Sequence, residues 1–213
     1  MDMGTGGTQV TSVLLSYLIT CIAIELTPGP NMAYLAVLSA ERGRMAGLFA
    51  VAGVALGLAV LGAMATVGVG EFIAGQPWLY ETLRWAGILY LLYLAYDAWA
   101  DAQRPLQVLD PKQLGWRSFR RGLVNNVLNP KAALFYITVM PSFVTPGQPA
   151  LEQAVLFGAI YVVVATAIHA GVVLLASSIQ PLLTQAASRR IMGGIFAALL
   201  VAVAIWVGFN TAR

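Results

Sequence analysis

The chain has 213 residues, of which 59% are hydrophobic and only 10% are charged. Soluble globular proteins carry about 25% charged residues, so this composition excludes an ordinary water-soluble domain. Intrinsic disorder requires low hydrophobicity and high net charge, and it is excluded as well. The single cysteine, Cys21, cannot build a disulfide framework. The class that remains is an integral membrane protein.

Long stretches without any Asp, Glu, Lys or Arg predict where the chain crosses the membrane. A helix needs about 20 apolar residues to span a hydrocarbon core of about 30 Å. Five charge-free windows reach that length, and they cover residues 3–24, 45–70, 132–151, 153–188 and 191–212. With the mixed stretch 79–100 added, the sequence predicts six transmembrane helices, over residues 12–39, 45–70, 80–100, 120–142, 152–176 and 190–210.

The first of these helices is expected to remain in the mature protein. Residues 1–11 contain Asp2 and no Lys or Arg, so the basic leading region of a cleavable signal peptide is missing.

The basic residues of the loops predict the orientation of the chain. Nine of them fall in the loops after helices one, three and five, and loops 71–79 and 143–151 hold none. Because Lys and Arg concentrate on the cytoplasmic side, both termini are expected outside. The basic residues are split among short loops, so no nucleic-acid partner is expected. The nine residues are Arg42, Arg44, Arg104, Lys112, Arg117, Arg120, Arg121, Arg189 and Arg190.

Two similar motifs suggest an internal duplication. Residues 25–35 read ELTPGPNMAYL and residues 125–135 read NNVLNPKAALF. Three predicted helices separate the motifs, so the two halves would have opposite orientations, as in secondary transporters with inverted repeats. We therefore expect an all-α membrane protein with one transmembrane domain, 1–213, composed of a first three-helix repeat, 12–100, a cytoplasmic linker, 101–119, and a second repeat, 120–210.

Prolines in both motifs predict that helices one and four are broken at mid-membrane. Proline removes a backbone donor, and Thr27-Pro28 and Asn129-Pro130 resemble helix starts. A half-helix N-terminus attracts a carboxylate, and freed carbonyls attract an ammonium group. The breaks would therefore suit a zwitterionic amino acid; the alternative is that the prolines only kink packed helices. The predicted binding residues are Glu25, Thr27, Pro28, Gly29, Pro30, Asn31, Asn125, Asn126, Asn129, Pro130 and Lys131.

Ionisable groups inside the spans are candidates for substrate contact or proton coupling, because burying one in a membrane is costly. Glu25 is predicted to hold the substrate ammonium or to carry a proton, and Lys131 to hold a carboxylate. The alternative is a structural ion pair of Glu25 with Lys131 or Arg84. His169 is a second proton-coupling candidate or a hydrogen-bonded core residue. Asp97 is a third candidate, with an interface role as the favoured alternative.

Three stretches resemble the lysine exporter family, LysE/RhtB, and the likeness extends from about residue 12 to 210. They are LTPGPNMAYLAVLSAERGRMAGLFAVAGVALG (26–57), RWAGILYLLYLAYDAW (84–99) and FRRGLVNNVLNPKAALFY (119–136). The resemblance implies six helices in a bacterial inner membrane and export of amino acids or their derivatives, driven by the proton motive force. The residues that match its two signatures are Pro28, Gly29, Pro30, Asn31, Asn129, Pro130 and Lys131.

Two other function classes are weighed against export of amino acids. An intramembrane zinc enzyme of the HExxH type needs two histidines, and the chain has one. Export of a metal ion or another small solute by the same architecture is the alternative function, although soft-metal ligands are scarce. We expect no cofactor, no bound metal and no enzymatic activity. A homodimer is expected from the short chain and its small-residue helices.

Overall fold

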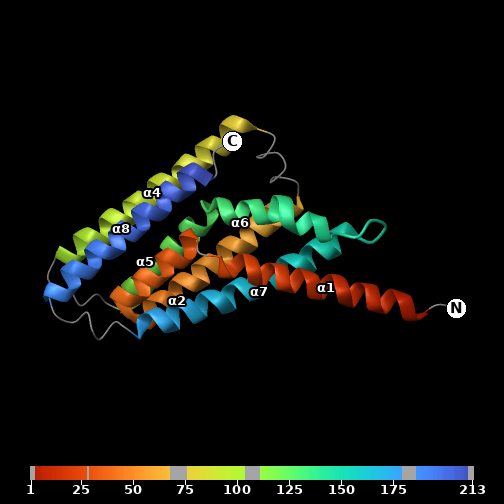
Figure 1. Cartoon of the computed structure of the whole chain (residues 1–213), viewed down its shortest axis with the longest axis horizontal. Helices are drawn as coiled ribbons and strands as arrows, with labels where there is room; N and C mark the ends of the chain where they lie inside the picture. The colour runs from red at the N-terminus through yellow and green to blue at the C-terminus, as the bar shows by residue number, and fades with distance from the viewer. Residues whose placement is uncertain (1–2, 28, 68–75, 104–110, 179–185, 211–213) are drawn as a thin grey trace.

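The computed structural model describes residues 3–27, 29–67, 76–103, 111–178 and 186–210. Within these residues every regular element is a helix, which confirms the predicted all-α class (Figure 1). The α-helices are α1 (Met3–Leu26), α2 (Pro30–Thr66), α4 (Pro77–Gln103), α5 (Pro111–Val127), α6 (Pro130–Leu134), α7 (Ala150–Ser177) and α8 (Ala186–Asn210). A π-helical turn, η1 (Phe135–Val139), and a 3-10 turn, η2 (Met140–Phe143), follow α6 directly.

Helix α2 consists of two arms that meet at a sharp turn. Gly43 adopts φ 83° and ψ 174° there, a backbone conformation that side chains with a Cβ disfavour. The two arms fold back on each other and lie in close contact. The closeness is evident at Gly47 in the second arm, where an added Cβ would collide with the Ser39 hydroxyl of the first arm. The arms thus correspond to the end of the first predicted span and to the second (Figure 1).

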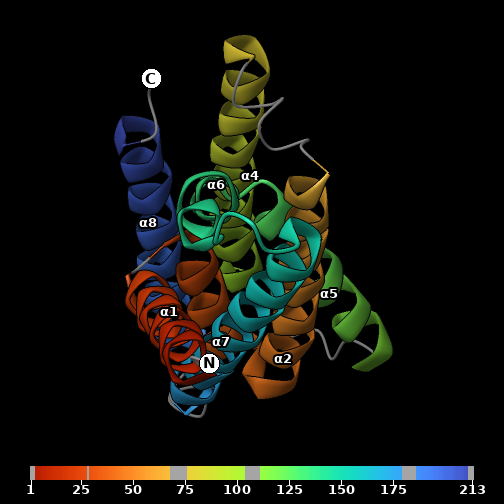
Figure 2. The same cartoon turned by 90° about the vertical axis from the view of Figure 1, so that its right-hand side faces the viewer.

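The helices pack in two groups. The second arm of α2 packs against α5 and α7, and α1 packs against α7. Helices α4 and α8 form a separate pair that lies alongside this group (Figure 2). Glycines bring α2 and α5 into backbone contact, since a Cβ at Gly53 would meet the Phe119 carbonyl and one at Gly122 would meet the Ala50 carbonyl. Close approach through small residues is a common basis of helix packing in membranes.

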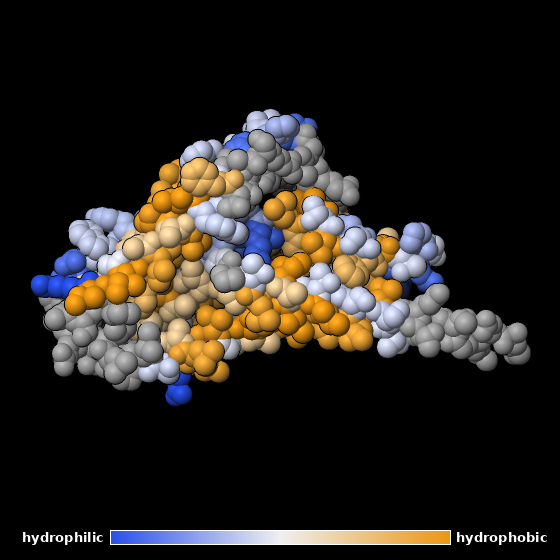
Figure 3. Space-filling model, viewed as in Figure 1, coloured by the Kyte–Doolittle hydropathy of each residue, from blue (hydrophilic) through white to orange (hydrophobic). Residues whose placement is uncertain are grey.

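The outer surface is apolar over much of its area, as a lipid-facing surface requires. Large hydrophobic side chains such as Leu89, Val163 and Phe209 are more than 60% exposed, and Figure 3 shows broad apolar faces along the helices. Two described helices are long and apolar enough to cross a membrane, Pro30–Thr66 and Ala150–Ser177, and two shorter apolar segments are Thr11–Leu26 and Gly193–Phe209. The fold is therefore that of a helical membrane protein.

The fourth predicted span differs most from expectation. Helix α5 begins at Pro111, so residues 111–119 of the expected linker are helical. Proline suits the first helical position, and the exposed Trp116 and buried Ser118 give this segment one buried and one exposed face. Beyond α6 the span continues as η1 and η2. Single π-helical turns occur frequently at functional sites.

Candidate functional site

The two proline motifs lie against each other in space. The Lys131 ammonium donates a hydrogen bond of 2.7 Å to the Thr27 carbonyl, across 104 residues of sequence. Beside this contact, the Asn125 amide donates to Asn31 Oδ1 at 2.9 Å, and the Asn31 amide donates to Asn126 Oδ1 at 2.7 Å. All three asparagines are buried. The side chains of Asn31, Asn125 and Asn126 therefore form a buried hydrogen-bonded cluster that joins the two motifs, beside the Lys131–Thr27 contact.

The second break has the local structure that its sequence predicts. Asn129 is the N-cap of α6, and its side-chain oxygen accepts a hydrogen bond of 3.1 Å from the Lys131 backbone N–H. Pro130 occupies the start of the helix, where its missing N–H costs nothing. This cap fixes the direction in which Lys131 leaves the helix.

The first break is built differently from the prediction. Helix α2 starts at Pro30 with Gly29 as its N-cap, so the helix does not begin at Thr27-Pro28. The Thr27 hydroxyl instead donates to the Ala23 carbonyl at 3.1 Å, on the helix that precedes the break. Gly29 has no side chain to cap α2, and its extended φ of −156° is open to any residue. Pro28 lies outside the described residues.

Glu25 sits beside the first break in a buried polar contact with α7. Tyr161 donates a hydrogen bond of 2.6 Å to Glu25 Oε1, and His169 Nε2 lies 3.2 Å from Glu25 Oε2. The relative exposures of Glu25 and His169 are 5% and 2%. The His169 Nδ1 atom has no hydrogen-bond partner among the described residues. The structure thus joins two of the three proton-coupling candidates.

Tyr161 is the site residue that the sequence interpretation missed. The signal in the sequence is the spacing of eight residues between Tyr161 and His169. In the structure, buried residues recur every four positions along α7, at Phe157, Tyr161, Ala165, His169 and Val173. Tyr161 therefore shares a helix face with His169, two turns away.

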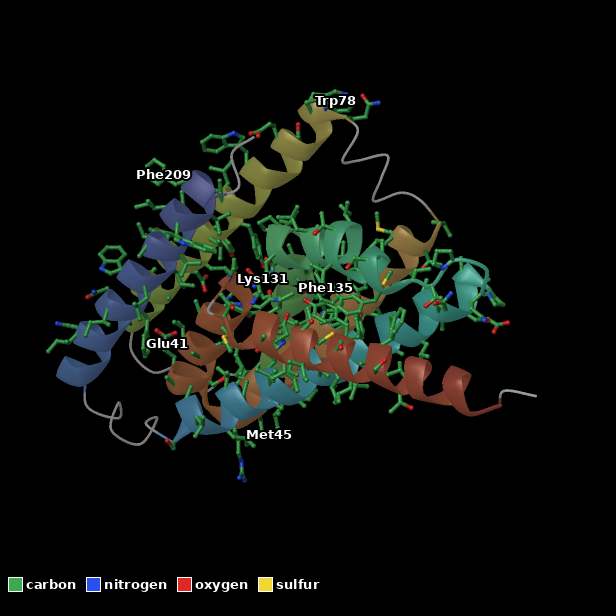
Figure 4. The ribbon with its side chains drawn as sticks, turned by 45° about the vertical axis from the view of Figure 1, so that its right-hand side comes forward. Glu41, Met45, Trp78, Lys131, Phe135 and Phe209 are labelled. Carbon is green, nitrogen blue, oxygen red and sulfur yellow. The ribbon has the colours of Figure 1, made fainter. Side chains whose placement is uncertain are left out.

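Two cavities border the breaks. Lys131, whose side chain is labelled in Figure 4, lines both. The polar cavity, of about 10 Å³, is lined by Glu25, Gly29, Asn31, Met32, Asn129, Lys131 and His169. The apolar cavity, of about 320 Å³, lies between both proline motifs and α8. The polar cavity has room for roughly one water molecule, so it is closed to an amino acid in this conformation.

Asp97 lies apart from this cluster. It accepts hydrogen bonds from Arg121 at 2.7 Å and Arg117 at 3.1 Å, and so it ties α4 to α5. Arg121 also lies over the Tyr93 ring, 6.0 Å from its centroid. Neither cavity at the breaks is lined by Asp97.

The fold and the paired breaks define a helical membrane protein with a polar site enclosed among its helices. Comparison with known proteins gives the family. The model of the LysE type translocator family matches residues 22–211, and the chain belongs to that family. The protein is therefore a membrane transporter of an efflux family.

Several curated relatives are similar over most of their length. The homoserine/homoserine lactone efflux proteins of Salmonella typhimurium (strain LT2) and Salmonella typhi are each 28% identical over 189 residues, which cover 88% of this chain and 92% of the relative. An uncharacterized membrane protein of Pseudomonas aeruginosa is 34% identical over 149 residues, or 66% of this chain and 69% of that protein. No solved structure matches the chain.

Proposed function

We propose that the protein is a secondary active exporter of amino acids or amino-acid derivatives. It works by alternating access around a site formed by the two helix breaks. The observation that carries the proposal is the hydrogen bond of 2.7 Å from the Lys131 ammonium to the Thr27 carbonyl. This contact pairs the Lys131 ammonium of the second break with the Thr27 backbone carbonyl of the first break. The efflux function of the Salmonella relatives supports the same reading.

The Lys131–Thr27 contact suggests how a zwitterion would bind. A substrate carboxylate replaces the Thr27 carbonyl as the partner of Lys131, and the substrate ammonium replaces Lys131 as the donor to that carbonyl. Both groups exchange one hydrogen-bond partner for another, so neither is left unpaired in the membrane, where that would be costly. The buried Asn31, Asn125 and Asn126 hold the two breaks in position around the substrate.

Coupling to protons would run through Glu25 and His169. The Glu25 carboxylate accepts from Tyr161 and lies against His169, one residue before α1 ends at Leu26. Protonation of Glu25 removes the charge that holds this contact, and so it can bias the break between two conformations. Asp97 is bound by two arginines on another helix, and we assign it an interface role.

The proposed topology places the described basic side chains near the loops after α4 and α7 and at the Gly43 turn in the cytoplasm. One end of the molecule, at the lower left of Figure 1, holds the turn at Gly43 and the ends of four helices. These are the end of α4, the start of α5, the end of α7 and the start of α8. These segments carry the basic residues Arg42, Arg44, Arg117 and Arg120. By the positive-inside rule this end is cytoplasmic, and both termini face the periplasm of a bacterial inner membrane. Residues 12–100 and 120–210 form inverted repeats.

Transport by the purified protein tests the proposal. Proteoliposomes that contain the protein and an imposed pH gradient should accumulate a labelled amino acid, and dissipation of the gradient by a protonophore should abolish accumulation. Empty liposomes are the control. No transport of any amino acid or derivative, in either direction of the gradient, would overturn the proposal.

A further inference from the structure

The apolar cavity lies where both helix breaks and α8 meet. Its lining comes from α1, α2, α6, η1 and α8, and it includes the two prolines that begin the second half-helices, Pro30 and Pro130. Its volume of about 320 Å³ falls within the range of small-molecule sites, about 300–1,000 Å³. The space beside the substrate head group is therefore large enough for a substrate side chain.

The chemistry of the lining selects what that side chain can be. Lys131 is the charged residue among those that line the apolar cavity. The hydroxyl of Thr138 is already bonded to the Leu134 carbonyl at 2.7 Å. The other lining residues are apolar or aromatic: Ile24, Pro30, Pro130, Leu134, Phe135, Val139, Trp206 and Val207. No carboxylate is among them.

Lys131 connects this cavity to the polar one. It lines the apolar cavity and also the polar cavity that holds Glu25, Asn31 and His169. An ionic head group at Lys131 can therefore extend its side chain into the apolar cavity. A cationic side chain would lie next to the Lys131 ammonium with no anion to pair it, because Glu25 lies in the polar cavity, bound by Tyr161 and His169. Burial of an unpaired charge is strongly unfavourable.

We infer that the substrate is an amino acid with an uncharged, apolar side chain, whose carboxylate binds Lys131 and whose side chain fills the apolar cavity. This inference rests on the proposed export function. It goes beyond the names of the Salmonella relatives, which refer to homoserine and its lactone. A lipid chain is the competing occupant of the cavity.

A matched pair of substrates tests the inference. Norleucine and lysine have the same linear carbon chain and differ in the terminal ammonium. In the proteoliposome assay we expect norleucine to be transported at least about tenfold faster than lysine, and faster than homoserine, since apolar pockets discriminate by about this factor. Transport of lysine or homoserine at the rate of norleucine would overturn the inference and leave export of amino acids intact. No transport of any of the three, or of alanine, would overturn the proposed function as well.

A cavity-filling variant separates the substrate from a lipid. Thr138 is exposed and lines the cavity, so Thr138→Trp should fill it and still fold. The control is Val163→Trp, an exposed position of similar starting size on α7. We expect T138W to lower norleucine transport by about tenfold while alanine transport stays within about twofold, and V163W to change neither. Leu134→Phe, which narrows the same cavity, provides a second variant. If T138W and L134F both leave norleucine transport unchanged, a lipid or nothing occupies the cavity and the inference is wrong.

Discussion

The two helix breaks carry similar motifs but supply opposite chemistry. The second break is capped by the Asn129 side chain and directs a cation, Lys131, toward the first. The first break has no side-chain cap at Gly29 and presents the Thr27 backbone carbonyl and, two residues earlier, Glu25. The second break therefore supplies the hydrogen-bond donor and the first break supplies the acceptor. Two similar motifs can thus produce an asymmetric site, as the proposed binding of a zwitterionic substrate requires.

The largest expected effect is loss of the Lys131 charge. Lys131→Met keeps the unbranched chain but removes the ammonium, and a hydrogen bond to a charged group contributes about 1.5–3 kcal/mol. Transport should fall by about 10- to 100-fold, measured as initial rate in proteoliposomes. The control is Arg120→Met, which removes an exposed basic residue on α5. Equal rates for K131M and wild type would show that the second break is not the donor side of the site.

The second prediction separates coupling from binding at the first break. Glu25→Gln retains an acceptor for Tyr161 but cannot lose and regain a proton. We expect the variant to exchange labelled for unlabelled amino acid and to lose accumulation driven by a pH gradient. Glu152→Gln, at an exposed position near the start of α7, is the matched control. Accumulation by E25Q at the wild-type level would remove Glu25 from the coupling mechanism.

The third prediction compares the two N-caps directly. Asn129→Ala should lower the free energy of unfolding by about 1 kcal/mol, the usual contribution of an N-cap side chain. Gly29→Ala needs no change of backbone conformation, but its Cβ would lie 3.3 Å from Lys131 Cδ. It should change stability by less than about 0.5 kcal/mol and weaken substrate binding by displacing Lys131. Thermal unfolding in detergent measures the change in stability, and binding titrations measure the change in affinity. A loss of stability in G29A without a loss of binding, together with unchanged stability in N129A, would contradict the assignment of donor and acceptor.

The positions of several helices were predictable because the few charged residues lie mostly at the ends of the apolar stretches. Helix α4 contains the predicted span 80–100, α7 contains 152–176 and α8 contains 190–210. Each helix extends at most a few residues beyond its predicted span. The helical start at Pro111 was not expected, since basic residues in 112–121 read as a loop. A helix that borders the membrane tolerates them on an exposed face.

The sequence predicted which residues belong to the candidate site, but it did not predict which of them contact each other. The motifs identified Glu25 and Lys131, and the sequence left open that they pair with each other. In the structure Glu25 contacts His169 and Tyr161, while Lys131 binds the Thr27 carbonyl. Such contacts depend on how α1 packs against α7, which no local pattern encodes. Tyr161 was missed because an uncharged aromatic residue in a span looks like ordinary core or interface.

The smallest expected effect lies outside the breaks. Asp97→Asn weakens the ion pairs with Arg117 and Arg121, and partly exposed ion pairs contribute about 1 kcal/mol or less. We expect a small loss of stability in thermal unfolding and an unchanged ratio of accumulation with and without the pH gradient. A collapse of that ratio in D97N, with folding preserved, would return Asp97 to the proton-coupling candidates.

In the proposed mechanism, Lys131, held over the first break, binds the substrate carboxylate. Binding of an amino acid and of its decarboxylated amine, measured by titration on purified wild type and K131M, tests it most directly. We expect wild type to bind the amino acid at least about tenfold more tightly than the amine, as for a charge-assisted hydrogen bond, and K131M to bind the two equally. Preserved discrimination in K131M would contradict the claim.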